Sequence, residues 1–187
     1  ETSVYASKIN YFDLIKNKLS FWMATGSGKT IVMIKAIVVL FELMKLKSVP
    51  TKPIMILAPT NDILKQIKNT IDSFNKGSST KIALKELKGN WEADNADFTQ
   101  EHSNLSLWSD NTVYYYKSNN FVTTKEEVAK AKDGRNIYYK NYLASSGWYL
   151  FLDEAHRGDS ETSKRKAIFD ILAKDGALIN FSATFVD

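Results

Sequence analysis

Short apolar runs alternate along the chain with longer segments in which apolar residues recur at every third or fourth position. The runs predict buried strands at residues 19–23, 53–58, 149–152 and 178–181. The segments between them predict helices at residues 29–44, 62–74 and 164–173. Continuous apolar strands separated by helices are typical of a mostly parallel sheet with helices on both faces. We therefore expect one doubly wound α/β domain.

The middle of the chain departs from this alternation. Residues 88–111 are polar and show no clear period, which predicts a surface insertion or long loop. Beyond it, residues 113–116 predict a further strand. Residues 124–132 predict a helix with Thr123 or Thr124 as its N-cap.

Composition and charge narrow the classes of protein. Hydrophobic residues make up 44 % and charged residues 25 % of the 187 residues, which is enough for an ordinary core. The chain has no cysteine and two histidines, which excludes a disulfide scaffold and a cysteine-ligated zinc site and argues against a histidine-rich metal site. A net charge of +4 permits a nucleic-acid partner.

The same sequence also predicts where the protein is located and whether the chain is a fragment. No apolar stretch approaches the ~20 residues that span a bilayer, so we expect no membrane partner. The lack of cysteine favours the cytoplasm. Because the first residue is Glu1, we expect the chain to be a piece of a longer protein.

The strongest local pattern is Ala24-Thr25-Gly26-Ser27-Gly28-Lys29-Thr30, between a predicted strand and a predicted helix. Glycines let successive backbone N–H groups point at one anion, and the helix adds its positive N-terminal end. Lys29 supplies a charge for the β- and γ-phosphates, and the Thr30 hydroxyl can ligate Mg²⁺. The strict P-loop pattern has glycine where Met23 stands, and the alternative is a glycine-rich turn with a surface lysine.

Two carboxylates, Asp153 and Glu154, follow the predicted strand at 149–152. Ligands of open α/β sheets lie at the carboxyl ends of the strands, so Asp153 is predicted to meet the metal near Thr30. Glu154 would polarise an attacking water as a general base. The alternative is a solvated turn that caps the next helix.

Four segments resemble motifs of the superfamily 2 helicases and translocases. They are residues 24–30 as motif I, Ala58-Pro59-Thr60 with Leu64 and Gln66 as motif Ia, Asp153-Glu154-Ala155-His156 as a DEAH-type motif II, and Ser182-Ala183-Thr184 as motif III. Flanking residues 147–158 and 180–185 are similar to the Res subunit of type III restriction enzymes. The Met23-Ala24-Thr25-Gly26 opening resembles both type I and type III restriction motors.

The resemblance implies a RecA-like P-loop NTPase domain over residues 1–187, the first motor domain of a DNA helicase or translocase of a restriction system. It implies ATP and Mg²⁺ as cofactors, hydrolysis of ATP, and duplex DNA bound through its backbone. The implied partners are a second motor domain, absent from this chain, and nuclease or modification subunits. Without the arginine finger of that second domain, we expect the chain to bind nucleotide but to hydrolyse it poorly.

The resemblance also assigns roles position by position. Lys29 and Glu154 would be catalytic, with Glu154 activating water. The cofactor would be bound by Thr25, Gly26, Ser27, Gly28, Lys29, Thr30 and Asp153, with Thr30 and Asp153 as metal ligands. Coupling between nucleotide and nucleic acid would fall to His156, Ser182 and Thr184. Contacts with the nucleic-acid backbone would fall to Pro59, Thr60 and Asn61.

Several alternatives stay open at this point. Ser182 and Thr184 also fit a strand-end turn, and Thr60 or Asn61 a helix cap that is compatible with a backbone contact. Residues 164–166 are either phosphate contacts or a solvated helix start, and residues 114–117 either stack on bases or pack within the fold. The alternative functions are an ATP-switched module that binds or remodels nucleic acid, and an RNA helicase.

Overall fold

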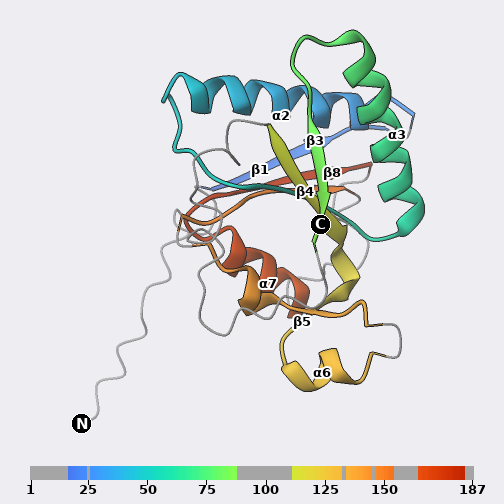
Figure 1. Cartoon of the computed structure of the whole chain (residues 1–187), viewed down its shortest axis with the longest axis vertical. Helices are drawn as coiled ribbons and strands as arrows, with labels where there is room; N and C mark the ends of the chain where they lie inside the picture. Colours follow the sequence, from blue (N-terminus) through green and yellow to red (C-terminus); the bar gives the residue numbers. More distant parts are fainter. Residues whose placement is uncertain are drawn as a thin grey trace.

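The computed structural model describes residues 17–24, 26–87, 111–131, 134–144, 146–153 and 164–183. The strands of its main sheet are β1 (Lys18–Trp22), β2 (Ile54–Ala58), β3 (Ala83–Glu86), β4 (Thr112–Lys117), β7 (Tyr149–Asp153) and β8 (Ala177–Ser182). Within the described residues the sheet has the order β1-β8-β7-β2-β4-β3, and every pairing in it is parallel. The predicted α/β sheet is confirmed (Figure 1).

The central strands are the ones that the apolar runs predict most closely. Every residue of β2 and β7 is buried. The edge strand β3 was missed, because its sequence Ala-Leu-Lys-Glu is short and largely exposed and leaves no apolar run to detect. Most of the predicted insertion at 88–111 lies outside the described residues.

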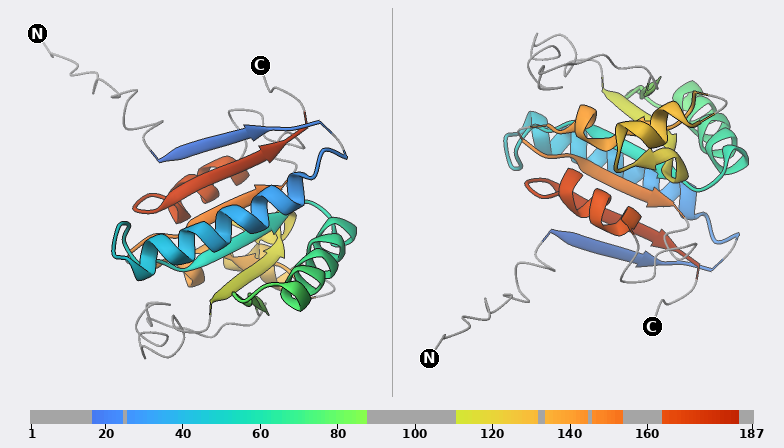
Figure 2. Two further views of the ribbon diagram at one scale, coloured as in Figure 1. Left: turned by 90° about the horizontal axis from the view of Figure 1, so that it is seen from above. Right: turned by 90° about the horizontal axis from the view of Figure 1, so that it is seen from below.

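Helices cover both faces of the sheet, as predicted. Helices α2 (Lys29–Lys45) and α3 (Asn61–Gly77) lie on one face, and α7 (Lys164–Leu172) lies on the other (Figure 2). One core forms between the sheet and the first pair, with α2 contributing Met33, Ile34 and Ile37. The second core forms under α7. In the described part of the chain, no helix is both long enough and apolar enough to cross a membrane.

A small second sheet lies on the α7 side. It pairs β5 (Phe121–Val122) with β6 (Ile137–Tyr138), flanked by the 3-10 turns η1 (Ser118–Asn120) and η2 (Tyr139–Tyr142) and by α6 (Lys125–Ala129). Thr124 caps α6 in a reciprocal capping box with Glu127, which selects between the two predicted caps. That bond network, led by the Thr123 amide, lowers the pKa of Glu127. The helix ends at Ala129, earlier than the predicted 132.

The tyrosine run in β4 packs inside the fold rather than presenting rings for base stacking. Tyr114 meets Trp148 edge-on, with 5.7 Å between ring centroids, and burial raises the pKa of its hydroxyl. Tyr116 donates a hydrogen bond of 2.6 Å to the carbonyl of Arg135. Both side chains belong to the core beneath α7.

Tyr115 points to the opposite face, as alternation along a strand requires. Its hydroxyl donates to the carboxylate of Glu86 and accepts from the ammonium of Lys68, each at 3.1 Å. The contact with Tyr115 raises the pKa of Lys68. This network ties α3 to the outer strands of the sheet and occupies the Glu86 carboxylate.

Gly176 allows the close turn between α7 and β8, and its replacement tests that packing. A Cβ at this position would lie 1.9 Å from the backbone oxygen of Trp148, which is itself held by the Ala177 amide at 3.0 Å. We expect Gly176→Ala to lower the free energy of unfolding by about 3 kcal/mol, because backbone atoms must move to accept the methyl group. Chemical denaturation measures the change.

The matched control for this prediction is Gly77→Ala. A Cβ there would meet nothing within 4 Å. Its unfolding free energy should stay within about 0.5 kcal/mol of the wild-type value. If the two variants unfolded at the same denaturant concentration, the close contact between Gly176 and Trp148 would be wrong.

Candidate functional site

The loop that joins β1 to α2 has the backbone shape of an anion-binding turn. Gly26 and Gly28 have φ values of 79° and 89°, a region that residues with a side chain rarely adopt. The Ser27 amide donates to the Ala24 carbonyl at 3.1 Å and closes the turn. Among the described residues, a Cβ on either glycine would meet nothing within 4 Å, so the need for glycine at these positions comes from the backbone conformation.

The start of α2 has the charge and amides that favour an anion. Gly28 is its N-cap, no side chain caps the helix, and no acidic residue lies in its first turn. The first amides of a helix have no partner within it, and they carry the positive end of the helix dipole. Phosphate oxygens are suited to this position.

The first residue of α2 and the last residue of β7 meet beside this loop. The Nζ atom of Lys29 lies 3.0 Å from Oδ1 of Asp153, and the two side chains are 12 % and 4 % exposed. Their pairing offsets the cost of removing each charge from water. The structure thus brings together two of the predicted site residues that are far apart in sequence.

Strand β8 lies between β1, which leads into the glycine loop, and β7, which ends at Asp153. Ser182, at its end, accepts a hydrogen bond of 2.9 Å from the Met23 amide. In the sheet register, Trp22 faces Ser182 and Asp153 faces Phe181. Ser182, one of the predicted coupling residues, therefore sits between the glycine loop and the acidic strand end, with only 4 % of its surface exposed.

The predicted nucleic-acid contacts lie at the same edge of the sheet. They form the turn from β2 into α3, defined here as the Pro59–Asn61 turn. Thr60 is the N-cap of α3 and accepts from the Ile63 amide at 3.3 Å, while Asn61 is the first helical residue. Pro59 is buried, and its carbonyl accepts from the side-chain amide of Asn119 at 3.1 Å.

Four of the predicted site residues lie outside the described part of the chain: Thr25, Glu154, His156 and Thr184. Gly26, Ser27 and Thr30 lie in the loop and the first turn of α2 beside Lys29.

The sequence reasoning missed Asn119, which the structure places at this edge. It accepts from the guanidinium of Arg165 and donates to the Pro59 carbonyl. The signal was present, because Ser118-Asn119-Asn120 is a polar triplet directly after the predicted strand in β4. The rule that selected Asp153 at the end of β7 selects this triplet as well. Residues 164–166 lie at the start of α7, and Arg165 is engaged with Asn119 there.

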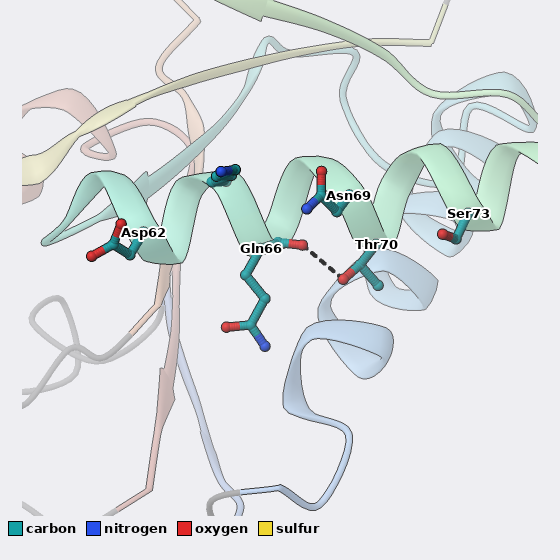
Figure 3. Close-up of a pocket in the computed structure, with 6 residues that line it drawn as sticks. Asp62, Gln66, Asn69, Thr70 and Ser73 are labelled. Atoms are coloured by element: carbon teal, nitrogen blue, oxygen red, sulfur yellow. Dashed lines mark hydrogen bonds between the residues drawn. The ribbon is translucent and has the colours of Figure 1, made fainter.

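A separate surface pocket lies along α3, and none of its residues is a predicted site residue. It is lined by Asp62, Lys65, Gln66, Asn69, Thr70 and Ser73. Figure 3 shows these side chains on one helix, with the Thr70 hydroxyl donating to the Gln66 carbonyl at 2.8 Å. Because it lacks the glycine loop and the Lys29–Asp153 pair, we do not assign the nucleotide to it.

Comparison with known proteins adds one result to this geometry. The model of a family described as "Type III restriction enzyme, res subunit" matches residues 3–187. The matched range includes the glycine loop, the Pro59–Asn61 turn and Asp153. A search of curated proteins found no match.

Proposed function

Because the chain belongs to the family of type III restriction enzyme res subunits, we propose that it binds ATP with Mg²⁺ and hydrolyses it to drive movement along duplex DNA. The family makes it a helicase-like motor domain with a P-loop α/β fold. The observation that carries the proposal furthest is the meeting of Lys29 and Asp153 beside the glycine loop, at 3.0 Å. An ammonium and a carboxylate held there match the two charges that a magnesium-bound triphosphate requires.

The residues of the loop fit this ligand. Among the described residues, none lies within 4 Å of a Cβ on Gly26 or Gly28, and the start of α2 at Gly28 offers backbone amides to phosphate oxygens. Lys29 would leave Asp153 and pair with the β- and γ-phosphates. Asp153 and the Thr30 hydroxyl would then hold the metal, which when bound neutralises the charge on the phosphates.

Turnover and movement are assigned to residues of the segments that resemble motifs Ia, II and III. Glu154, which follows Asp153 in the chain, would accept a proton from the attacking water. Ser182, Thr184 and His156 would transmit the state of the nucleotide. The Pro59–Asn61 turn would hold the phosphate backbone of DNA through its exposed polar groups. We further propose a second motor domain and nuclease or modification subunits as partners.

The direct test measures ATP turnover by the natural full-length protein, with and without duplex DNA. We expect DNA to raise the rate at least about tenfold, because closure on nucleic acid completes the site for hydrolysis. A rate near zero that DNA leaves unchanged would contradict the enzymatic proposal and favour a module whose ATP site only switches shape. Stimulation by duplex RNA in preference to DNA would identify an RNA helicase instead.

A further inference from the structure

Asn119 makes two contacts at once at the carboxyl edge of the sheet. Its side-chain amide donates to the Pro59 carbonyl at 3.1 Å, and its side-chain oxygen accepts from Arg165 in the first turn of α7. Both polar ends of the amide are therefore used, which fixes its orientation. The residue connects the β2–α3 junction to the helix that follows the acidic strand end along the chain.

The segment that carries Asn119 packs firmly onto the fold. Asn119 lies in η1, the turn that immediately precedes Phe121, and Phe121 is only 3 % exposed. The Phe121 ring packs edge-on against Phe169 of α7, with 6.3 Å between centroids, and against Tyr142 at 6.4 Å. The segment that carries Asn119 is thus docked onto α7 by an aromatic contact as well as by the bond from Arg165.

The Pro59–Asn61 turn receives from Asn119 a contact that its own residues do not supply. The Thr60 hydroxyl is directed at the Ile63 amide as a helix cap. The Pro59 carbonyl, which lies before the helix, accepts a hydrogen bond of 3.1 Å from the Asn119 side-chain amide. The orientation of the turn relative to α7 therefore depends on this amide.

We infer that Asn119 is a positioning residue, which holds the Pro59–Asn61 turn against α7 so that binding of nucleic acid at the turn is transmitted to the region of the acidic strand end. The inference rests on the proposed function and adds to it a route between the two sites. Asn119 acts through the Pro59 carbonyl and Arg165 and does not itself contact the ligand.

The test uses the full-length protein and linear duplex DNA, and follows ATP turnover as the DNA concentration increases. For Asn119→Ala we expect the DNA concentration at half-maximal stimulation to rise about threefold to tenfold, as the loss of one or two hydrogen bonds implies. Asn119→Asp keeps the acceptor for Arg165 but loses the donor to Pro59, so it should show a loss of the same size. Unchanged stimulation in Asn119→Ala would overturn the inference.

A double-mutant cycle separates positioning from direct contact. If Asn119 and Arg165 act through their bond, Asn119→Ala combined with Arg165→Ala should lose no more than the single variants, and the salt dependence of DNA binding should keep its slope. Multiplied losses with a shallower slope would mean that Arg165 neutralises a phosphate itself, and would overturn the positioning role. Equal falls in basal and stimulated turnover would also overturn it, because they indicate a general defect of the fold.

Asn17 offers a matched control at the opposite end of the sheet. Its side-chain amide also donates to a backbone carbonyl, that of Lys174, at 3.1 Å. Asn17→Ala removes a bond of the same kind and should leave both basal and DNA-stimulated turnover at wild-type values. If the wild-type protein itself shows no stimulation, the proposed function fails. If wild type, Asn17→Ala and Asn119→Ala are all stimulated alike, only the positioning role fails.

Discussion

Replacement of Lys29 by alanine is expected to weaken ATP binding by at least about 100-fold, to the point where it is no longer detected at ordinary concentrations. Two effects add. The variant loses the ammonium of the first residue of α2, and the carboxylate of Asp153, 4 % exposed, loses the partner that lies 3.0 Å away. A carboxylate that has lost this ammonium repels phosphate. Calorimetric titration with ATP and Mg²⁺ measures the loss.

Lys35→Ala is the matched control, because it also removes one lysine charge from α2. Lys35 is an exposed residue of the same helix, and its ammonium lies over the ring of Phe74, 5.1 Å from the centroid, away from Asp153. This variant should bind ATP like the wild type. If Lys29→Ala bound ATP equally well, the nucleotide would have to lie elsewhere.

A second variant separates binding from folding. Loss of one partner of a buried ion pair also destabilises a protein, by about 3 kcal/mol or more. Lys29→Ala combined with Asp153→Asn also removes the carboxylate that faced Lys29 and should recover most of that stability in thermal unfolding. It should not recover ATP binding, because neither the phosphate charge nor the metal ligand returns.

The framework of the fold could be predicted because burial leaves a direct trace in sequence. Strands β2 and β7 are buried on both faces, so β2 appears as an unbroken apolar run and β7 as an apolar run that ends at Asp153. Helix α3 shows a periodic pattern instead of a continuous run. Its buried residues Leu64, Ile67 and Ile71 recur every three or four positions, as one buried face of a helix requires. The local sequence alone is enough to predict these elements, without information about the segments that pack against them.

The elements that were missed depend on contacts with distant parts of the chain. The outer strand β3 is defined by its pairing with β4, and its own residues are mostly exposed. Strands β5 and β6 have two residues each, which is too short for any alternation to be seen. Their position is set by packing on α7, through contacts such as that between Phe121 and Phe169.

The candidate site, too, has features that could be predicted from the sequence and features that could not. The glycine loop and Asp153 could be selected because strand ends and glycine turns are visible in sequence and the topology of parallel sheets brings strand ends to one edge. The direct pairing of Lys29 with Asp153 and the two bonds of Asn119 could not be selected, because side-chain partners follow from three-dimensional spacing. The same holds for the choice of Thr60 over Asn61 as the cap of α3.

The second large effect is expected at Glu154, which we propose as the residue that activates water. Glu154→Gln keeps the size of the side chain but removes its ability to take a proton. Because Lys29 and Asp153 are untouched, ATP should bind with wild-type affinity, while the rate of hydrolysis in the full-length protein should fall about 100-fold to 10,000-fold. Single-turnover hydrolysis, measured with and without duplex DNA, separates the chemical step from binding and product release.

Glu42→Gln is the matched control, because it makes the same change of charge at a position that has no proposed role in binding or hydrolysis. Glu42 lies on the exposed side of α2 and pairs with Lys45 at 3.0 Å. This variant should bind and hydrolyse ATP like the wild type. If Glu154→Gln also hydrolysed ATP at the wild-type rate, another group would have to take the proton. If it instead lost ATP binding together with turnover, Glu154 would belong with Asp153 as a ligand of the metal, since a general base acts on the water and not on the affinity of the bound nucleotide.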